Sequence, residues 1–365
     1  MSTKRLFKVS LLPRRYRPSA TGPYAQTLSA NDVQMCLRAA FGGTLGFIIC
    51  KLMNWNYGAF FVVYPMLLLA LVPVLNGHVI RQFLASMVLI SFSTLFVQGA
   101  LGDRPIPMTM TAMVMFAILF RCMSQGPYFL FGALGITGLS IQLHFASYPY
   151  PSTHVSDMVM SNIAATFVTI LIAMLMHTFF PDAEPRTPRK PPPKPASNLR
   201  HEIILTTTVA TLSFIVFQVL DLKGSLSAQM ASILILFPLN WHGAGKAAWN
   251  RAVGTLIGCN VGLLIQFVLL THSNMLLFVS FGLWFSIMLF ARHHAHEGGG
   301  SGAGFGAMTT MAILFGQYLT PTQDLVYNAL YRFTSVSVSV VLTLLIIYLM
   351  HLLLNRFEAT RLYIN

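Results

Sequence analysis

The sequence predicts an all-α polytopic membrane protein built from two parallel pseudo-repeats of about six transmembrane helices each. Three observations predict this fold class. Apolar residues make up 55% of the 365 residues and charged residues only 9%, whereas an average globular protein has about 25% charged residues. The apolar residues gather in runs close to the ~20 residues that a membrane helix requires. Lys and Arg lie mainly between these runs, as in the cytoplasmic loops of membrane proteins.

Residues 1–30 form a basic, polar segment with six Lys and Arg residues. This segment lacks the apolar core and cleavage site of a secretory signal peptide, so we expect a cytoplasmic tail. The formal net charge of +13 does not indicate nucleic-acid binding, because the charges lie at the chain ends, in one linker and in short loops. Such loops are drawn instead to the anionic lipid heads of the bilayer.

Twelve apolar runs are candidate spans, six in each half of the chain. Two of them, 108–121 and 226–240, are short for a span and could be re-entrant, whereas the last run is long enough to tilt or to project beyond the bilayer. The runs fall near residues 33–53, 57–75, 82–101, 108–121, 127–146, 158–180, 203–221, 226–240, 252–271, 276–291, 303–319 and 325–354.

The distribution of Lys and Arg orients these spans. If the N-terminus is cytoplasmic and the spans alternate in direction, all but four of the 23 Lys and Arg residues lie on the cytoplasmic side or close to it. The positive-inside rule therefore predicts that both termini are cytoplasmic. The four exceptions are Lys51, Arg104, Lys223 and Arg332.

A proline-rich segment, residues 181–199, separates the two halves. Its six prolines between residues 185 and 195 remove backbone donors and favour an extended conformation. We expect a semi-rigid cytoplasmic linker; the alternative is a ligand for a proline-binding module. The predicted order is a tail at 1–30, a first transmembrane half at 31–180, the linker, a second transmembrane half at 200–355 and a cytoplasmic C-terminus at 356–365.

The two halves share features in the same order, which indicates an internal repeat. The second span of each half contains a proline, Pro65 or Pro238, and a polar turn follows it that begins with Asn76 or Asn240. Each sixth span begins after an aspartate on the outer side. Because both halves start inside, the repeat is parallel, with its axis along the membrane normal. The two aspartates are Asp157 and Asp324.

Several classes of function are excluded or disfavoured by the residues. No Gly-Lys-Ser/Thr phosphate-binding loop is present, so direct ATP hydrolysis is not expected and the protein is not predicted to be an enzyme. The four cysteines form no CxxC pair, so we predict small buried side chains and neither a disulfide framework nor a zinc site. We expect no cofactor and no bound metal.

Residues 250–258, with the sequence NRAVGTLIG, resemble the Arg-x-x-Gly-Thr-x-x-Gly element that opens a third span in the fusaric acid resistance and aromatic acid exporter superfamily. The two six-span halves joined by a cytoplasmic segment also resemble that superfamily. Residues 81–86 of the first half lack the Gly-Thr pair, and the short linker replaces the large cytoplasmic domain of many members. The resemblance is therefore to a compact branch of the superfamily.

The resemblance implies a bacterial inner-membrane transporter. It implies export of small organic compounds, aromatic or anionic ones among them, with a role in drug resistance and often with a periplasmic adaptor protein. We expect a secondary transporter driven by the proton gradient, because the chain has no ATP-binding motif, and we expect homo-oligomers. A passive anion channel is the first alternative. A membrane scaffold whose tail and linker bind partners is the second.

Charged side chains inside spans are costly and are therefore candidates for function. Arg332 lies eight residues after Asp324, about two helical turns along one face, and a guanidinium can bind a carboxylate at two points. Structural ion pairs and cytoplasmic anchoring are the alternative roles for these arginines. The predicted substrate path or gate consists of Arg332, Arg251, Arg81, Arg121, Asp324 and Asp157.

Two further groups of residues follow from local spacing. Gly254 and Gly258 share one helix face at a four-residue spacing, which permits close helix packing. The cluster His293, His294, His296 and Glu297 precedes a glycine-rich stretch and could relay protons, because histidine titrates near neutral pH. The alternative for this cluster is a solvated loop.

Overall fold

The structure is a computed structural model in which the described part of the chain is helical throughout its regular elements. The predicted N-terminal tail, the middle of the linker and Asp324 lie outside the described residues. The structure describes residues 28–72, 74–102, 104–146, 154–186, 194–269, 272, 274–298, 300, 302–318 and 325–363.

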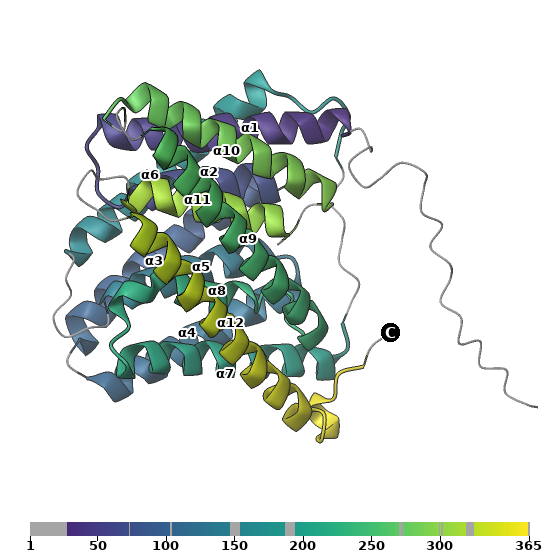
Figure 1. Ribbon diagram of the computed structural model, residues 1–365. Helices are drawn as coiled ribbons and strands as arrows, with labels where there is room; N and C mark the ends of the chain where they lie inside the picture. Colours follow the sequence, from purple (N-terminus) through teal and green to yellow (C-terminus); the bar gives the residue numbers. More distant parts are fainter. Residues whose placement is uncertain are drawn as a thin grey trace, which may run out of the picture.

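The first half contains six helices (Figure 1). Ser29 begins the first of them, and its side chain accepts a hydrogen bond from the backbone amide of Asp32. Such a side-chain cap satisfies an amide that the first helical turn leaves unpaired. The helices are α1 (Ala30–Leu52), α2 (Gly58–Leu71), α3 (Gly77–Leu101), α4 (Pro105–Gln125), α5 (Phe129–Ala146) and α6 (Val155–Phe179).

The second half also contains six helices, with a 3₁₀ turn before the second and another after the last. The helices are α7 (Ala196–Val219), α8 (Leu226–Leu234), α9 (Trp241–Val268), α10 (Leu276–His296), α11 (Ala303–Tyr318) and α12 (Leu325–Leu354), and the turns are η1 (Lys223–Ser225) and η2 (Glu358–Thr360). The predicted all-α class is confirmed.

Nine of the described helices are long and apolar enough to cross a membrane. The short run 226–240 corresponds to α8, which has only 9 residues. The suggestion that residues 108–121 could be re-entrant is wrong, because α4 has 21 residues. Pro105 is tolerated at its start, where a missing amide costs no helical hydrogen bond, and the helix continues past the apolar run through Arg121 and Ser124.

Helix packing within the first half has a counterpart six helices later. Helix α1 packs on α2 and α6 as α7 packs on α8 and α12, and α3 packs on α5 and α6 as α9 packs on α11 and α12. Across the halves, α1 packs on α10 as α4 packs on α7, and α2 packs on α11 as α5 packs on α8. This correspondence supports the predicted repeat.

The polar turns before α3 and α9 have the same structural role. The side chain of Asn76 accepts a hydrogen bond from the Val79 amide at 2.9 Å, and that of Asn240 accepts one from the Gly243 amide at 2.8 Å. Each asparagine therefore caps the third helix of its half. In Figure 1, α12 ends on the side of the bundle where α1 begins.

Candidate functional site

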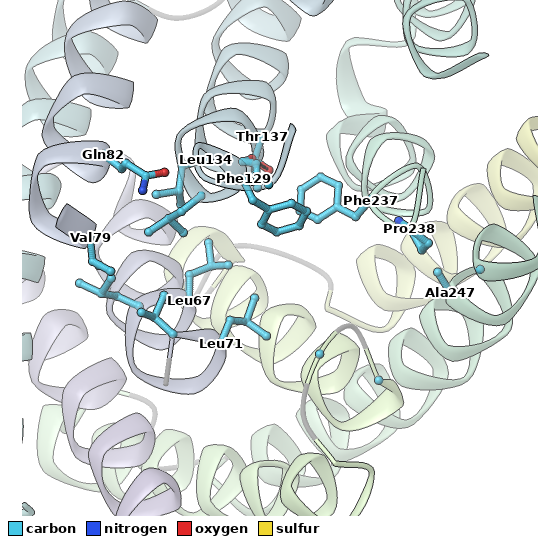
Figure 2. A pocket seen from close by; sticks show the side chains of 18 of the residues that line it. Leu67, Leu71, Val79, Gln82, Phe129, Leu134, Thr137, Phe237, Pro238 and Ala247 are labelled. Atoms are coloured by element: carbon cyan, nitrogen blue, oxygen red, sulfur yellow. Dashed lines mark hydrogen bonds between the residues drawn. The ribbon is translucent and has the colours of Figure 1, made fainter. Parts of the chain in front are cut away.

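A cavity of about 850 Å³ lies between the two halves (Figure 2). The cavity lies among the helix ends that adjoin the loops predicted to be cytoplasmic. Its lining consists of Leu67, Leu68, Leu71, Val72, Val79, Gln82, Phe83, Gly126, Pro127, Phe129, Leu130, Ala133, Leu134, Thr137, Phe237, Pro238, Gly243, Lys246, Ala247, Asn250, Glu297, Gly300 and Gly302.

Each half contributes corresponding elements to this cavity. The first half supplies the end of α2 and the starts of α3 and α5, and the second half supplies the residues after α8, the start of α9 and those leading into α11. Within each half these are the second, third and fifth helices. The cavity therefore lies where the two halves face each other, at one end of the bundle.

Most of the cavity wall is apolar. Figure 2 shows Phe129 from the first half and Phe237 from the second projecting toward the same space. The polar side chain of Gln82 is bonded within its own half: it accepts a hydrogen bond from the Phe131 amide at 2.9 Å and donates one to the Pro127 carbonyl at 3.3 Å. The first half therefore presents mainly hydrocarbon.

The positive charge at the cavity comes from the second half. Lys246 lies in its wall and is exposed. One residue past the lining Asn250, the side chain of Arg251 lies behind the wall, only 6% exposed. It lines a small second cavity of about 20 Å³ together with Ala247 and Gly302, which line the large cavity too. Arg251 is thus one layer away from the main space.

Arg251 is held by a hydroxyl and lies near another arginine. Its Nη1 donates a hydrogen bond to Thr309 Oγ1 of α11 at 2.8 Å. Arg332 of α12 is 3% exposed and lies close enough for the two guanidinium groups to repel each other electrostatically. No described carboxylate lies within ion-pair distance of Arg251. Buried charges are normally paired, so the surroundings of Arg251 favour an anion electrostatically.

Close helix packing places Thr309 within reach of Arg251. A Cβ atom added to Gly254 would lie 2.5 Å from the Ala303 carbonyl oxygen, and one added to Gly258 would lie 2.9 Å from Thr310 Cβ. Both glycines of α9 therefore face α11. The Gly-Thr element of the sequence therefore belongs to the surface on which α9 packs against α11. This packing holds the buried Arg251 in place.

The other charged residues of the predicted path do not gather at the cavity. Arg81, Arg121 and Asp157 are exposed at or near helix ends, and none of them lines the cavity. Asp324, the proposed partner of Arg332, lies outside the described residues. Of the four predicted arginines, the structure brings together only Arg251 and Arg332.

The four residues of the predicted proton relay have different environments in the structure. The carboxylate of Glu297 accepts hydrogen bonds from the amides of Ala303 and Gly304, both at 2.9 Å, and so caps α11. His293 lies 3.5 Å from that carboxylate, His294 is fully buried against the Ala70 carbonyl, and His296 is half-buried. The part of the chain that is described contains no group of three or more side chains suited to a metal.

Replacing Glu297 by alanine is expected to destabilise the protein by about 1 kcal/mol, the usual contribution of an N-terminal cap. Glu184→Ala is the control, because Glu184 makes its hydrogen bonds to Asn31 through its backbone. Thermal unfolding of the two purified variants would measure the difference. Equal stability of Glu297→Ala and the native protein would contradict the capping role.

The far end of the bundle is closed by two corresponding contacts between the halves. In α5, the fully buried His144 hydrogen-bonds through Nδ1 to the side-chain oxygen of Gln229 in α8. In the corresponding α2 and α11 pair, a Cβ atom on Gly58 would lie 2.8 Å from the Gly316 carbonyl oxygen. The sequence placed His144 and Gln229 in spans but gave no signal that they meet.

Comparison with known families assigns the two halves to two models. Residues 35–176 match a family described as a protein of unknown function (DUF2955). Residues 211–346 match the family described as fusaric acid resistance protein-like, which confirms the resemblance predicted from residues 250–258. No curated protein and no solved structure matches the chain. The chain is therefore a multi-pass membrane protein with a second half like that of a transporter-type family.

Proposed function

We propose that this membrane protein with a fusaric-acid-resistance-like second half is a secondary transporter that exports small organic anions from the cytoplasm. The observation that carries the proposal is the cavity of about 850 Å³ between the two halves. Its volume lies within the range of about 300–1,000 Å³ that is typical of sites for small molecules. The positive-inside rule supports a cytoplasmic opening, since the cavity adjoins the predicted inner loops.

The arrangement of closed and open ends supports alternating access. At the inner end the halves separate around the cavity, and at the outer end the α5–α8 and α2–α11 contacts hold them together. Transport would require the outer contacts to separate while the cavity closes, as repeat-based transporters do by moving one half against the other. A continuously open anion channel, the first alternative, would lack such an outer closure.

The charges support an anionic substrate with an apolar body. Lys246 and the buried Arg251 lie on the second-half side, while the acidic charge of Glu297 is engaged as a helix cap. Leu67, Phe129 and other apolar side chains would contact the body of the ligand. We propose the proton gradient as the source of energy, with the bacterial inner membrane as the location and both termini in the cytoplasm.

Val79→Trp is expected to impair export severely, because an indole at this position projects into the cavity that Val79 lines and takes up space needed by the ligand. Val88→Trp is the matched control: it lies on the same helix, and its side chain is 60% exposed on the outer surface. Export of fusaric acid would be measured in inverted membrane vesicles with an imposed proton gradient. We expect the Val79 variant to retain less than about one tenth of native export, equivalent to at least ~1.4 kcal/mol.

Two results would contradict the proposal. Native-level export by Val79→Trp at normal protein levels would exclude the cavity as the route. Export that continues unchanged with an uncoupler, down a substrate gradient alone, would favour the channel alternative. The scaffold alternative predicts no transport at all. A periplasmic adaptor and homo-oligomer formation remain predictions, which co-purification and native mass spectrometry would test.

A further inference from the structure

The last nine described residues, 355–363, which we call the C-terminal segment, dock on the start of α7. The side chain of Asn198 accepts a hydrogen bond from the Tyr363 amide at 2.8 Å and donates one to the Tyr363 carbonyl at 2.9 Å. His201, also on α7 and fully buried, donates from Nδ1 to the Thr360 carbonyl at 2.7 Å. The C-terminal segment is therefore fastened to α7 at two points.

His201 belongs to a chain of hydrogen bonds that extends to α12. Its Nε2 lies 3.1 Å from His351 Nδ1, and His351 Nε2 lies 3.0 Å from the amide nitrogen of Asn355. A carbonyl oxygen can only accept and an amide nitrogen can only donate. The direction of the whole chain is therefore fixed, from Asn355 through His351 and His201 to Thr360, and each imidazole carries one proton.

Protonation of either histidine breaks this chain. A second proton on His201 would occupy Nε2 and face the Nδ1 proton of His351. A second proton on His351 would occupy its Nε2 and face the Asn355 amide donor. In both cases a donor meets a donor, and on His201 the positive charge also lies in a fully buried position, which costs free energy. The bonded arrangement is therefore satisfied only when both imidazoles are neutral.

The charged and titratable neighbours give this charge little compensation. The ring of His242, on α9, lies 6.5 Å from that of His351, and Arg361 of the C-terminal segment is bonded to the Asn355 carbonyl. Glu202, which follows His201, is bonded to Lys194 and Ser124. Glu358 in η2 is exposed, as are Arg200 on α7 and Arg356.

The first half fastens the corresponding segment without histidine. Asn31 of α1 accepts hydrogen bonds from the amides of Ala183 and Glu184 at 2.7 and 3.1 Å, as Asn198 does from Tyr363. Arg38 donates to the Phe180 carbonyl at 3.1 Å and pairs with Asp182 at 2.8 Å. Arginine stays charged at every physiological pH, and the neighbouring His177 is bonded to the Ala173 carbonyl of its own helix instead of to this segment, so this contact serves as the internal reference.

The geometry points to a pH-sensitive latch in the second half: His201 and His351 hold the C-terminal segment on α7 when neutral and release it when either is protonated. The latch is independent of the proposed function. It lies beside the candidate site, however, because His242 precedes Lys246 by one helical turn on α9. Acidification of the compartment that contains the C-terminus would thus change the structure next to the mouth of the cavity.

Hydrogen exchange of the full-length protein in lipid nanodiscs would test the latch between about pH 8 and about pH 5.5, the range in which histidine changes charge. After correction for intrinsic rates, the amide of Tyr363, which donates to Asn198 of α7, should lose protection at the acidic pH. Below the pKa that controls release, the loss should approach about ten-fold for each pH unit. The amides of Ala183 and Glu184 should stay protected at both values.

Variants separate the latch from a general effect of acid. Asn198→Ala gives the exchange of an undocked segment, which the native protein should approach at acidic pH. The double variant His201→Gln/His351→Gln keeps a donor and an acceptor at both positions but cannot titrate, so its exchange should be independent of pH. His242→Gln, next to the chain but not in it, should respond like the native protein. A native segment whose protection does not change with pH, or a pH response that persists in the double variant, would overturn the proposal.

Discussion

Gly254→Ala is expected to destabilise the folded protein by about 1–3 kcal/mol, the usual cost of forcing an extra methyl group into a packed interface. The new Cβ would lie 2.5 Å from the Ala303 carbonyl oxygen and 2.9 Å from the Ala307 backbone nitrogen. Both are backbone atoms of α11, so no side-chain rotation can relieve the contact. Helices α9 and α11 must move apart, and Thr309 then moves away from Arg251.

Gly245→Ala is the matched control on the same helix. An added Cβ at Gly245 would meet no atom within 4 Å, and alanine favours a helix over glycine by up to about 1 kcal/mol. This variant should unfold at the native temperature or slightly above it. Thermal unfolding of both variants in one detergent gives the comparison. A Gly254→Ala protein as stable as Gly245→Ala would show that α9 and α11 are not packed as closely as the structure places them.

Arg251→Met is expected to weaken the preference for carboxylates while leaving the fold intact. Arg251 lies one layer behind the cavity wall, so it attracts a bound carboxylate through its charge. At an effective dielectric constant of ~20 and a separation of ~8 Å this attraction is ~2 kcal/mol. Affinity for an aromatic carboxylate should therefore fall at least about 10-fold. The fold should not suffer, because the substitution removes a buried charge that is repelled by Arg332. Replacement of a buried charge by a well-packed apolar side chain is often neutral or stabilising.

The test compares benzoate with its uncharged amide, benzamide, in binding to the purified protein. Arg251→Met should show a smaller preference for benzoate than the native protein, because among the described lining residues only Lys246 then supplies positive charge at the cavity. Arg251→Lys should keep more of that preference, and Arg81→Met should behave as the native protein, because Arg81 is exposed outside the cavity. An unchanged benzoate preference in Arg251→Met would refute the assignment. A large fall in unfolding temperature would instead indicate a structural role for Arg251.

The sequence predicted those parts of the fold that depend on local patterns. Composition and run length determined the membrane class, and an asparagine before an apolar run marked the starts of α3 and α9. The length of α4 was underestimated because Arg121 and Ser124 interrupt the apolar pattern but not the helix. Helix length in this position is set by packing against α5 and α7, which a hydropathy pattern does not record.

The candidate site could be predicted only in part. Arg251 and Arg332 were identified because charges inside spans are rare, but the sequence also gave Arg81 the same role, and the structure leaves that side chain at the surface. The residues that close the end opposite the cavity and form the latch are ordinary amides, glycines and histidines, 85 to 258 positions apart in the pairs His144–Gln229 and Gly58–Gly316. Only the packing of the two halves brings them together.

The unequal walls of the cavity have a practical consequence. The first-half side of the cavity is apolar and the second-half side carries cations. The cavity is therefore complementary to an amphiphile with an alkyl tail and an acidic head group. Fatty acids and anionic detergents carry both features and should therefore occupy the space between Phe129 and Lys246. Solubilisation in such amphiphiles would mask the site, so binding measurements are best made after extraction in neutral sugar-headed detergents and transfer to nanodiscs.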